Sequence, residues 1–450
     1  LFLALRGASH DGRRFLGQAA AAGAVAALIE DEPFAVEAGI PVHAVPGLRQ
    51  HVGEIASRFY GYPSRALHIA AVTGTNGKTT VSQLLAQLIR AAGYDCGVMG
   101  TLGASLDGRP SGSTHTTPDA ITVHATLAEW VAAAVPFATM EVSSHALDQG
   151  RVGAVEFDTA IFTNLTRDHL DYHGDMQAYG EAKIRLFEFP ALRTAVLNAD
   201  DPFCAQVSGR LSDDVTCIRY SIGAAEAELR LSALEFDKRG LRARLQSPWG
   251  SATLRSPLLG AYTASNLAAA LAAALTAGLP LEATVKAVAS LTPVPGRMEP
   301  LPRRDNSPLV VVDYAHTPDA LRQVLTALRP QVSGRLIAVF GCGGDRDRGK
   351  RADMAACASA LADVSFVTSD NPRSEDPQSI IDDITAGMSG DYRPILDRAA
   401  AIAEAVAFAN SEDCVLIAGK GHEDYQIIGE QRLPFSDVEQ ARSALAERSA

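Results

Sequence analysis

Hydrophobic residues recur with two different spacings along this chain, and together these spacings predict an α/β protein. Short apolar runs typical of buried parallel strands occupy residues 1–5, 24–29, 67–72, 137–142, 160–163, 194–197, 309–312, 336–340, 364–367 and 415–418. Helical patterns separate many of these runs. In residues 79–92, Leu84, Leu85, Leu88 and Ile89 share one helix face before Gly93. Strands that alternate with helices favour parallel sheets covered by helices on both faces.

Two clusters of turn-forming residues divide the 450-residue chain, at 60–64 and at 293–296. They predict a small N-terminal α/β domain (1–65), a central parallel-sheet domain (66–298) and a C-terminal Rossmann-like domain (299–450). Because residues 1–5 read as a strand already under way, we expect the first domain to be truncated at its start, with functional residues before Leu1.

Composition and charge narrow the class of function. The formal net charge of −12 disfavours nucleic acid and anionic membranes as partners. The six cysteines include no Cys-x-x-Cys pair, and dispersed thiols suit a reducing compartment. No apolar run approaches the roughly 18 residues that a membrane span needs, and no signal peptide is visible. We therefore expect a cytoplasmic protein, monomeric, that acts on small molecules.

A glycine-rich loop follows the predicted strand 67–72 and precedes the predicted helix 79–92. The residues that this loop contributes are Gly74, Thr75, Asn76, Gly77, Lys78, Thr79 and Thr80. Such a loop points its amides at phosphate oxygens, while Lys78 can reach the terminal phosphates and Thr79 can ligate Mg²⁺. Val72 stands where the usual pattern has its first glycine, and a chance Gly-Lys-Thr turn is the alternative. The flanking strand and helix favour ATP binding.

Polar residues also follow two other strands of the central domain. Glu141 ends a buried run, where a carboxylate can ligate a metal near phosphates, although a surface acid is the alternative. The segment 162–174 packs Asp168, His169, Asp171 and His173 together, which suits a second cation or a substrate phosphate, against the alternative of a polar loop. By pattern alone, Lys183 reads as an ordinary exposed helix lysine.

Four polar loops follow strands of the C-terminal domain, at 313–319, 341–347, 370–373 and 419–424. Because the carboxyl ends of parallel strands share an edge, we expect these loops to form one rim. The rim carries both signs of charge, with Arg346, Arg373 and Lys420 against acids that include Asp370 and Glu423. Mixed charge suits a zwitterion such as an amino acid, with an arginine gripping its carboxylate. Solvated loops are the alternative.

The segments 74–80, 141–145, 168–169, 295–297 and 313–316 resemble the Mur ligases, ATP-dependent amide ligases of peptidoglycan precursor synthesis. The resemblance covers nearly the whole chain, in order. Residues 370–373 and 419–423 are similar to the form that adds meso-2,6-diaminopimelate to UDP-N-acetylmuramoyl-L-alanyl-D-glutamate. This implies a central ATPase domain between a UDP-precursor-binding and an amino-acid-binding domain. Ligation of L-lysine, another Mur ligase, a folylpolyglutamate synthase and a regulatory or recycling nucleotide-binding protein remain alternatives.

The resemblance also implies a role for individual residues. Thr79 and Glu141 match Mg²⁺ ligands, and His169 and Lys183, as a CO₂-derived carbamate, match ligands of a second Mg²⁺. Lys78, Glu141, His169 and Lys183 would be catalytic, and the loop 74–80 would bind ATP with Asn266, Arg297 and Asp313. The UDP-precursor would contact Ser9, His10, Thr116, Thr117, Ser143, Gln149 and Arg151. Diaminopimelate would contact Arg346, Asp370, Asn371, Pro372, Arg373, Gly419 and Glu423. Arg373 would discriminate against lysine.

There are two departures from the family pattern. Thr263 stands where relatives often carry asparagine, which leaves Asn266 to support the ATP site in that segment. The stretch that binds uridine in the family would precede Leu1.

Overall fold

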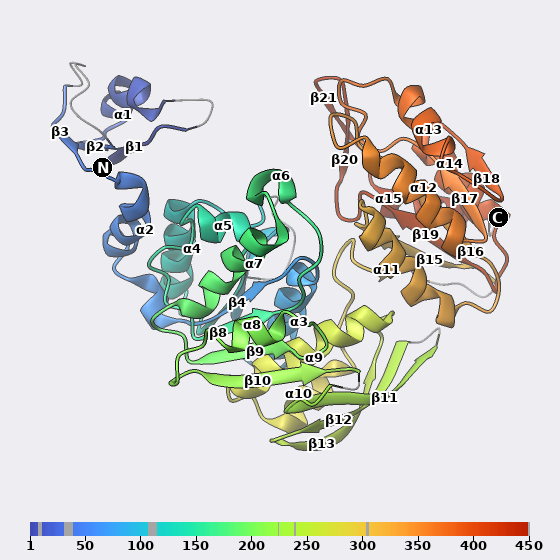
Figure 1. Cartoon of the computed structure of the whole chain (residues 1–450), viewed down its shortest axis with the longest axis horizontal. Coiled ribbons are helices and arrows are strands. Elements are labelled where there is room, and N and C mark those ends of the chain that lie inside the picture. Colours follow the sequence, from blue (N-terminus) through green and yellow to red (C-terminus); the bar gives the residue numbers. More distant parts are fainter. Residues whose placement is uncertain are drawn as a thin grey trace. The chain divides into compact units, whose positions relative to one another are not determined.

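A computed structural model describes residues 1–7, 11–30, 39–106, 115–223, 225–237, 240–302 and 306–448. These residues form two compact units, Leu1–Arg219 and Tyr220–Ala450 (Figure 1). Each unit contains its own α/β core, so the α/β fold class is confirmed. The domain boundaries at 65/66 and 298/299 stay predictions.

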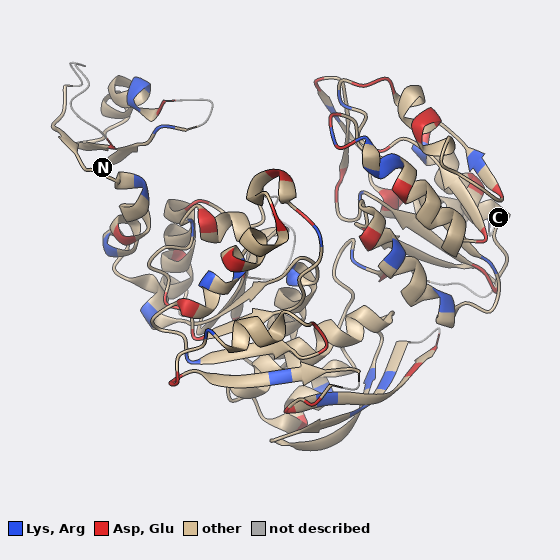
Figure 2. Cartoon of the chain, viewed as in Figure 1, with Lys and Arg blue, Asp and Glu red and all other residues tan. Residues whose placement is uncertain are grey.

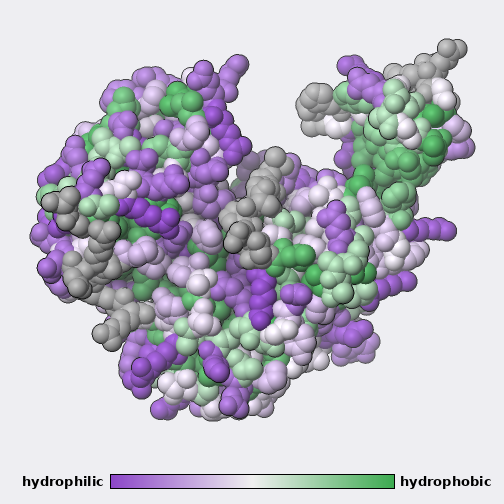
Figure 3. Space-filling model, turned by 180° about the vertical axis from the view of Figure 1, so that it is seen from behind, coloured by the Kyte–Doolittle hydropathy of each residue, from purple (hydrophilic) through white to green (hydrophobic). Residues whose placement is uncertain are grey.

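The first unit begins with a small three-stranded sheet. Its parallel strands and the helices beside them are β1 (Phe2–Ala4), β2 (Ala27–Ile29), β3 (Val42–Ala44), α1 (Leu16–Ala21) and α2 (Leu48–Phe59). Hydrophobic residues also gather on the outside of this small sheet, at the upper right of Figure 3. Two hydrophobic residues of this part of the chain, Leu1 and Val25, are 52% and 76% exposed.

Seven neighbouring strands of a ten-stranded sheet lie wholly or partly in the first unit, in the order β10-β9-β8-β4-β7-β5-β6. Its strands are β4 (His68–Thr73), β5 (Cys96–Gly100), β6 (Gly103–Ser105), β7 (Phe137–Glu141), β8 (Thr159–Phe162), β9 (Thr194–Asn198) and β10 (Thr216–Ser221). Strands β5, β7, β4, β8 and β9 are parallel, as expected, and β6 is antiparallel to β5. Val72 pairs with Glu141 and Thr73 with Phe162, so these three strands end side by side.

Helices that follow these strands complete the first unit. Their bounds are α3 (Lys78–Ala91), α4 (Ala120–Ala132), α5 (Ser144–Asp148), α6 (Leu170–His173), α7 (Met176–Ile184) and α8 (Cys204–Ser208). Asp119 caps α4 by accepting from the amides of Ile121 and Thr122, and Asp175 caps α7 in the same way. Because α3, α5 and α6 all start close to strand ends, the unit carries its polar loops on one edge.

The second unit opens with antiparallel strands that the sequence did not lead us to expect. These are β11 (Leu229–Asp237), β12 (Gly240–Ser247) and β13 (Gly250–Ser256), and Tyr220 at the end of β10 pairs with Leu229. Helices α9 (Ala261–Thr276) and α10 (Leu281–Val288) follow. No strand was predicted between residues 197 and 309, so this antiparallel segment was missed. Leu229 and Leu231 are buried while their neighbours are not, which is the period-two pattern of an antiparallel strand.

The remainder of the second unit is a doubly wound sheet with the strand order β14-β15-β19-β16-β17-β18. Its strands are β14 (Glu299–Pro300), β15 (Leu309–Asp313), β16 (Leu336–Phe340), β17 (Val364–Val367), β18 (Tyr392–Pro394) and β19 (Cys414–Ala418). All but β14 run parallel. A hairpin of β20 (Tyr425–Ile428) and β21 (Gln431–Pro434) follows β19.

Helices cover both faces of this second sheet (Figure 1). They are α11 (Pro318–Leu328), α12 (Gly349–Leu361), α13 (Pro377–Thr385), α14 (Arg398–Phe408) and α15 (Asp437–Glu447). Val311 and Leu416 pack in one core with α11, α12 and α13, whereas Val310 and Ile417 pack in another with α14 and α15. This alternation confirms the Rossmann-like prediction and gathers the loops after β15, β16, β17 and β19 on one edge.

Surface charge and thiols agree with the composition. Figure 2 shows acidic and basic residues interspersed along the helices of both units rather than gathered in one basic tract. All six cysteines are free. Among the helices that the structure describes, none is long and apolar enough to cross a membrane.

Candidate active site

The glycine-rich loop lies between β4 and α3 and closes over its own backbone. Lys78 begins α3, and its Nζ donates to the carbonyl oxygens of Gly74 and Thr75, each at 2.9 Å. Gly74 has φ +149°, and a Cβ there would lie 1.9 Å from Thr163 Oγ1, so a side chain cannot be accommodated. The Asn76 amide donates to Asn164 Oδ1 at 2.9 Å. The loop is thus held by the segment after β8, with its amides at a helix N-terminus.

Glu141 ends β7 beside this loop and is 1% exposed. Its Oε2 accepts from Thr79 Oγ1 at 2.8 Å and from Thr101 Oγ1 at 3.0 Å, and its Oε1 accepts from the Thr101 amide at 2.8 Å. A Cβ at Gly100 would lie 2.0 Å from Oε1, so that glycine makes room for the carboxylate. A hydroxyl and a carboxylate next to a phosphate loop are oxygen donors of the kind that Mg²⁺ prefers. Thr101 was not among the expected site residues.

The predicted precursor-binding residues near Glu141 are joined by hydrogen bonds. Thr117 Oγ1 donates to the Glu141 carbonyl at 2.8 Å and accepts from the Ser143 amide at 3.1 Å. The hydroxyls of Thr116 and Thr101 lie 3.2 Å apart. The loop after β7 and the approach to α4 therefore converge on the same carboxylate.

Arg151 extends this network. Its Nη1 donates to the Thr117 carbonyl at 2.9 Å, and its Nε and Nη2 donate to Gln149 Oε1 at 2.9 and 2.6 Å. The guanidinium is thus oriented by two neighbours. Ser9 and His10, which were also predicted to bind the precursor, lie outside the described residues.

His169 lies on the loop after β8, at φ +53°. Its amide donates to Asp168 Oδ1 at 2.9 Å, its Nε2 lies 3.5 Å from Asp168 Oδ2, and its ring centroid lies 4.8 Å from that of His145. Burial lowers the pKa of His169, and although Asp168 opposes this shift, the charges of Lys78 and Lys183 add to it. A neutral imidazole is the form that can ligate a metal.

The interpretation of Lys183 as an exposed lysine is wrong. Its side chain, near the end of α7, is 1% exposed, and its Nζ lies 4.2 Å from the centroid of the Tyr179 ring. Burial lowers the pKa of Lys183 well below 10.5, and the charge of Lys78 adds to this effect while Asp168 opposes it. The helix buries the neighbouring Ala182 and Ile184 as well, so no exposed stripe marks the lysine. A buried, neutral amine is a nucleophile.

A metal at this edge would need more than side-chain acids and imidazoles. Within the described ranges, no group of three or more His, Cys, Asp or Glu side chains forms a metal centre by itself. A cation here would also require hydroxyl oxygens such as that of Thr79, ligand phosphates, or a modified Lys183. That donor set fits Mg²⁺ bound together with a nucleotide.

The second unit carries the remaining residues predicted to face ATP. Asp313 ends β15 and is 6% exposed. It accepts from the amides of Met298 at 2.7 Å and Ala315 at 2.8 Å. Burial raises the pKa of Asp313, although Arg297 and these backbone donors oppose the shift. The Arg297 guanidinium lies 4.4 Å from the Tyr314 ring centroid. Asn266 lies buried in α9.

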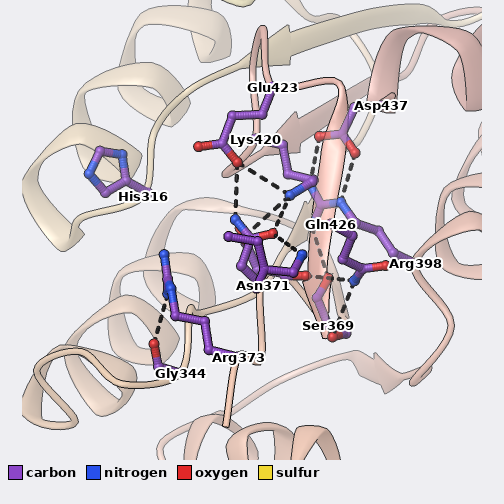
Figure 4. Close-up of polar contacts among 12 residues, drawn as sticks. His316, Gly344, Ser369, Asn371, Arg373, Arg398, Lys420, Glu423, Gln426 and Asp437 are labelled. Carbon is purple, nitrogen blue, oxygen red and sulfur yellow. Dashed lines mark hydrogen bonds and ion pairs between the residues drawn. The ribbon is translucent and has the colours of Figure 1, made fainter. Parts of the chain in front are cut away.

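The rim of the second unit has a buried cation at its base, as Figure 4 shows. Lys420 is 0% exposed. Its Nζ donates to Asn371 Oδ1 at 2.9 Å and lies 3.3 Å from Glu423 Oε2 and 3.8 Å from Asp370 Oδ1. Asn371 Nδ2 donates to the same Glu423 oxygen at 3.0 Å. Three of the predicted diaminopimelate-binding residues therefore meet around a lysine that had been predicted only as a rim charge.

Arg373 lies on the other side of this cluster. Its Nη1 donates to the Gly344 carbonyl at 2.7 Å, and its backbone is tied to Ile427 and Gly429 of the β20–β21 hairpin. The side chain is half-buried, and Figure 4 shows it around the same space as Glu423 and His316.

Arg346, Pro372 and Gly419 complete the predicted rim set. Arg346 is exposed and donates to the Asp345 carbonyl at 3.3 Å, whereas Pro372 is buried. Gly419 has φ +124°, and a Cβ there would lie 2.5 Å from Asp370 Oδ2. The structure thus brings most of the predicted rim residues together and leaves Arg346 pointing into solvent.

The fold and these two groups of residues define a nucleotide-binding α/β protein with a phosphate loop in one unit and a zwitterion-like charge pattern in the other. Comparison with known proteins identifies the family. Residues 72–274 match the Mur ligase middle domain, and residues 296–421 match the Mur ligase, glutamate ligase domain. The chain belongs to the Mur ligase family.

Individual relatives sharpen the comparison. The chain is 52% identical, over 99% of its length and 92% of the relative's, to UDP-N-acetylmuramoyl-L-alanyl-D-glutamate–2,6-diaminopimelate ligase of Ectopseudomonas mendocina. A solved structure of a ligase of that name covers 100% of this chain, with 92% of its own chain matched, at 42% identity and a TM-score of 0.73. Folylpolyglutamate synthase of Mycobacterium tuberculosis, complexed with ADP and AMPPCP, covers 89% of this chain and 94% of its own at 21% identity and a TM-score of 0.68, which shows a shared fold.

Proposed function

We propose that this chain is an ATP-dependent ligase that joins meso-2,6-diaminopimelate to UDP-N-acetylmuramoyl-L-alanyl-D-glutamate in peptidoglycan precursor synthesis. The 52% identical relative that carries this name supports the assignment. The observation that carries it on this chain is the rim, where the acids Asp370 and Glu423 lie 3.8 and 3.3 Å from Lys420 Nζ and Arg373 lies around the same space as Glu423. Such a cluster offers acids for an ammonium and a guanidinium for a carboxylate. We place the reaction in the cytoplasm and expect a monomer.

The first half of the reaction uses mainly residues of the first unit. The free carboxylate of the precursor attacks the γ-phosphorus of ATP, ADP leaves, and an acyl phosphate forms. Lys78 and the amides of the loop 74–80 neutralise charge on the transferring phosphoryl group. Thr79 and Glu141 would hold Mg²⁺, which when bound supplies positive charge between the two anions. Thr116, Thr117, Ser143, Gln149 and Arg151 would orient the precursor, and Asn266, Arg297 and Asp313 of the second unit would contact the nucleotide.

Lys183 takes part in this half-reaction as a carbamate. Its neutral amine attacks CO₂, forming an N–C bond and releasing a proton, and the product is an anion that can help His169 to hold a second Mg²⁺. The buried environment that lowers the pKa of Lys183 supports this step. Lys183→Ala should abolish phosphate release, with partial rescue by short carboxylates such as acetate. Unchanged activity in this variant would remove the carbamate from the proposal.

The second half of the reaction uses the rim. The amine of diaminopimelate attacks the acyl phosphate carbonyl, and the tetrahedral intermediate collapses with loss of phosphate and a proton to give the amide. Arg373 would bind the distal carboxylate bidentately while Asp370 and Glu423 accept from the distal ammonium. L-lysine lacks that carboxylate and would leave the guanidinium of Arg373 without its partner, which penalises lysine strongly.

Phosphate release tests the proposal directly. Purified protein with ATP, Mg²⁺ and the UDP-muramoyl dipeptide should release phosphate when meso-diaminopimelate is added, and much less with L-lysine. Lys78→Met is the negative control, because it removes the cation that would contact the phosphates. Release with lysine but not with diaminopimelate would overturn the substrate, and release that no amino acid stimulates would overturn the ligase assignment.

A further inference from the structure

A completely buried ion pair lies beneath the rim. Arg398 begins α14 and Asp437 begins α15, and both side chains are 0% exposed. Arg398 Nε donates to Asp437 Oδ1 and Nη2 donates to Oδ2, each at 2.7 Å, in the bidentate arrangement. Because desolvation offsets most of the attraction in such a pair, its burial is weak evidence for a contribution to stability. We therefore consider the pair for what it positions rather than for its contribution to stability.

The remaining hydrogen bonds of Arg398 reach two strand ends. Its Nη2 donates to the Ala418 carbonyl at 3.0 Å, and its Nη1 donates to the Ser369 carbonyl at 3.3 Å (Figure 4). Ala418 is the last residue of β19 and precedes Gly419, whereas Ser369 precedes Asp370. One guanidinium therefore fixes the two backbone positions from which the predicted amino-acid-binding loops begin.

The same guanidinium lies close to the Asp370 carboxylate without being its partner. A Cβ at Gly419 would lie 2.5 Å from Asp370 Oδ2 and 3.7 Å from Arg398 Nη2. Although burial alone would raise the pKa of Asp370, the charges of Arg398 and Lys420 hold it below its usual value. Asp437 accepts from Nε and Nη2 of Arg398, two donors that could otherwise bond to Asp370.

We propose that the Arg398–Asp437 pair is a positioning device for the amino-acid site. It holds the Ser369 and Ala418 carbonyls, and because Asp437 engages the guanidinium, the carboxylate of Asp370 stays available to a substrate ammonium. Asp437 balances Arg398, and Lys420 balances one of the two acids Asp370 and Glu423, so one formal negative charge is left for one ammonium. This inference rests on the proposed function, since it concerns the site for the distal end of diaminopimelate.

The chain offers a matched control at the opposite edge of the same sheet. Arg335, which precedes β16, pairs with Asp413, which precedes β19, at 2.7 Å, and the Asp413 side chain is 4% exposed. Arg335 also donates to the Phe408 carbonyl at 3.1 Å. Like Arg398, it pairs with a buried aspartate through two side-chain donors and bonds a backbone carbonyl, but it lies at the amino ends of the strands, away from the rim loops.

Steady-state kinetics of Asp437→Asn and Asp413→Asn test the proposal. Asp437→Asn should raise KM for diaminopimelate at least about tenfold while KM for ATP changes less than about twofold. Asp413→Asn should leave both KM values within about twofold, although both variants lower the thermal unfolding temperature. Asp437→Glu, which keeps the carboxylate, should recover part of the loss. Equal effects on both substrates, or an equal rise in KM with Asp413→Asn, would overturn the positioning role.

Two safeguards keep the result interpretable. If circular dichroism shows that Asp437→Asn does not fold, Arg398→Lys replaces it, because lysine keeps the charge but cannot bond both carbonyls and Asp437 together. The same selective rise in KM is expected, and an unchanged KM refutes the proposal. If diaminopimelate does not stimulate phosphate release by the wild-type enzyme, the proposed function is refuted. If the wild type depends on diaminopimelate but Asp437→Asn has a wild-type KM for it, only this inference is refuted.

Discussion

Replacing Lys183 by methionine should stabilise the first unit while it removes the amine on which the carbamate depends. The substitution keeps an unbranched side chain of similar length in α7. Lys183 is 1% exposed. Its Nζ makes no hydrogen bond or ion pair to any residue in the part of the chain that the structure describes, apart from its ring contact with Tyr179. The wild-type side chain is therefore an almost completely buried amine whose contact is an aromatic ring rather than an acid.

The magnitude has two parts. An unsatisfied buried polar group costs about 1–3 kcal/mol of folding free energy, which methionine would recover. In addition, burial lowers the pKa of Lys183 from 10.5, so between the lowered value and 10.5 the unfolded chain binds a proton that the folded chain does not. Stability then rises with pH by up to about 1.4 kcal/mol per pH unit in that window. The advantage of Lys183→Met should be largest near neutral pH and shrink towards pH ~10.5.

The two tryptophans of the chain make this measurable for the first unit alone. Trp130 is buried in α4 of that unit, and Trp249 belongs to the second, so a Trp249→Phe background leaves Trp130 as the only tryptophan reporter. Urea unfolding followed by Trp130 fluorescence, in buffer free of CO₂ and metal at pH 7.5 and pH 9, gives the free energy of unfolding of each variant. CO₂ must be excluded because a carbamate would replace the neutral amine by an anion and so change the free energy of unfolding.

Arg185→Met is the matched control, because Arg185 lies two residues further on and is exposed, with its Nη1 3.0 Å from Asp148 Oδ1. A surface pair of this kind contributes about 0–1 kcal/mol, so this variant should be unchanged or slightly less stable. If Lys183→Met proves less stable than wild type by more than about 1 kcal/mol, or if its advantage grows with pH, the description of Lys183 as an uncompensated neutral amine is refuted.

Three further substitutions test the site. Arg373→Ala should raise KM for diaminopimelate roughly 10–100-fold, because a charge-assisted hydrogen-bond pair is worth about 1.5–3 kcal/mol, while KM for ATP barely changes; equal effects in steady-state assays would mean that Arg373 is not the carboxylate clamp. Gly419→Ala should also raise KM for diaminopimelate selectively, since φ +124° and a Cβ 2.5 Å from Asp370 Oδ2 would displace that carboxylate; wild-type kinetics would refute the geometry. Glu141→Gln should lower kcat at least about 100-fold, while calorimetry should still detect nucleotide binding. A kcat within about tenfold of wild type would show that the negative charge of Glu141 is not needed for catalysis.

Regular elements were predictable wherever one local pattern decided the structure. The strands 336–340 and 364–367 have the predicted bounds, because a short apolar run that is buried on both faces leaves no competing interpretation. The strands β11–β13 were missed because buried and more exposed residues alternate along them. The predicted strands are continuous apolar runs, and an alternating strand contains no such run. The hairpin after β19 carries few buried residues and offers little apolar signal at all.

Site residues were predictable to the extent that a strand end places them. The rule that carboxyl ends of parallel strands share an edge placed Glu141, Asp313 and Asp370 at or just after strand ends, where the structure has them. It gave no indication that Lys183 and Lys420 are buried, because burial of a charged side chain depends on which other elements cover it. Arg398 and Asp437 were missed for the same reason, since residues at the first turn of a helix read as solvent-exposed caps. The resemblance to the family supplied Lys183 but not these supporting residues.

The two buried lysines therefore present the same residue type in opposite settings, and one substitution should move their units in opposite directions. Lys420→Met would leave Asp370 and Glu423 together without the cation that lies 3.8 and 3.3 Å from them, and Asn371 Oδ1 would lose a donor at 2.9 Å. Removing one member of a buried ion pair costs about 3–5 kcal/mol. Urea unfolding followed by Trp249 in a Trp130→Phe background should show this loss in the second unit, whereas Lys183→Met stabilises the first. If both substitutions shift stability in the same direction, the number of partners around a buried lysine does not decide whether it serves as a fixed charge or as a reactive amine.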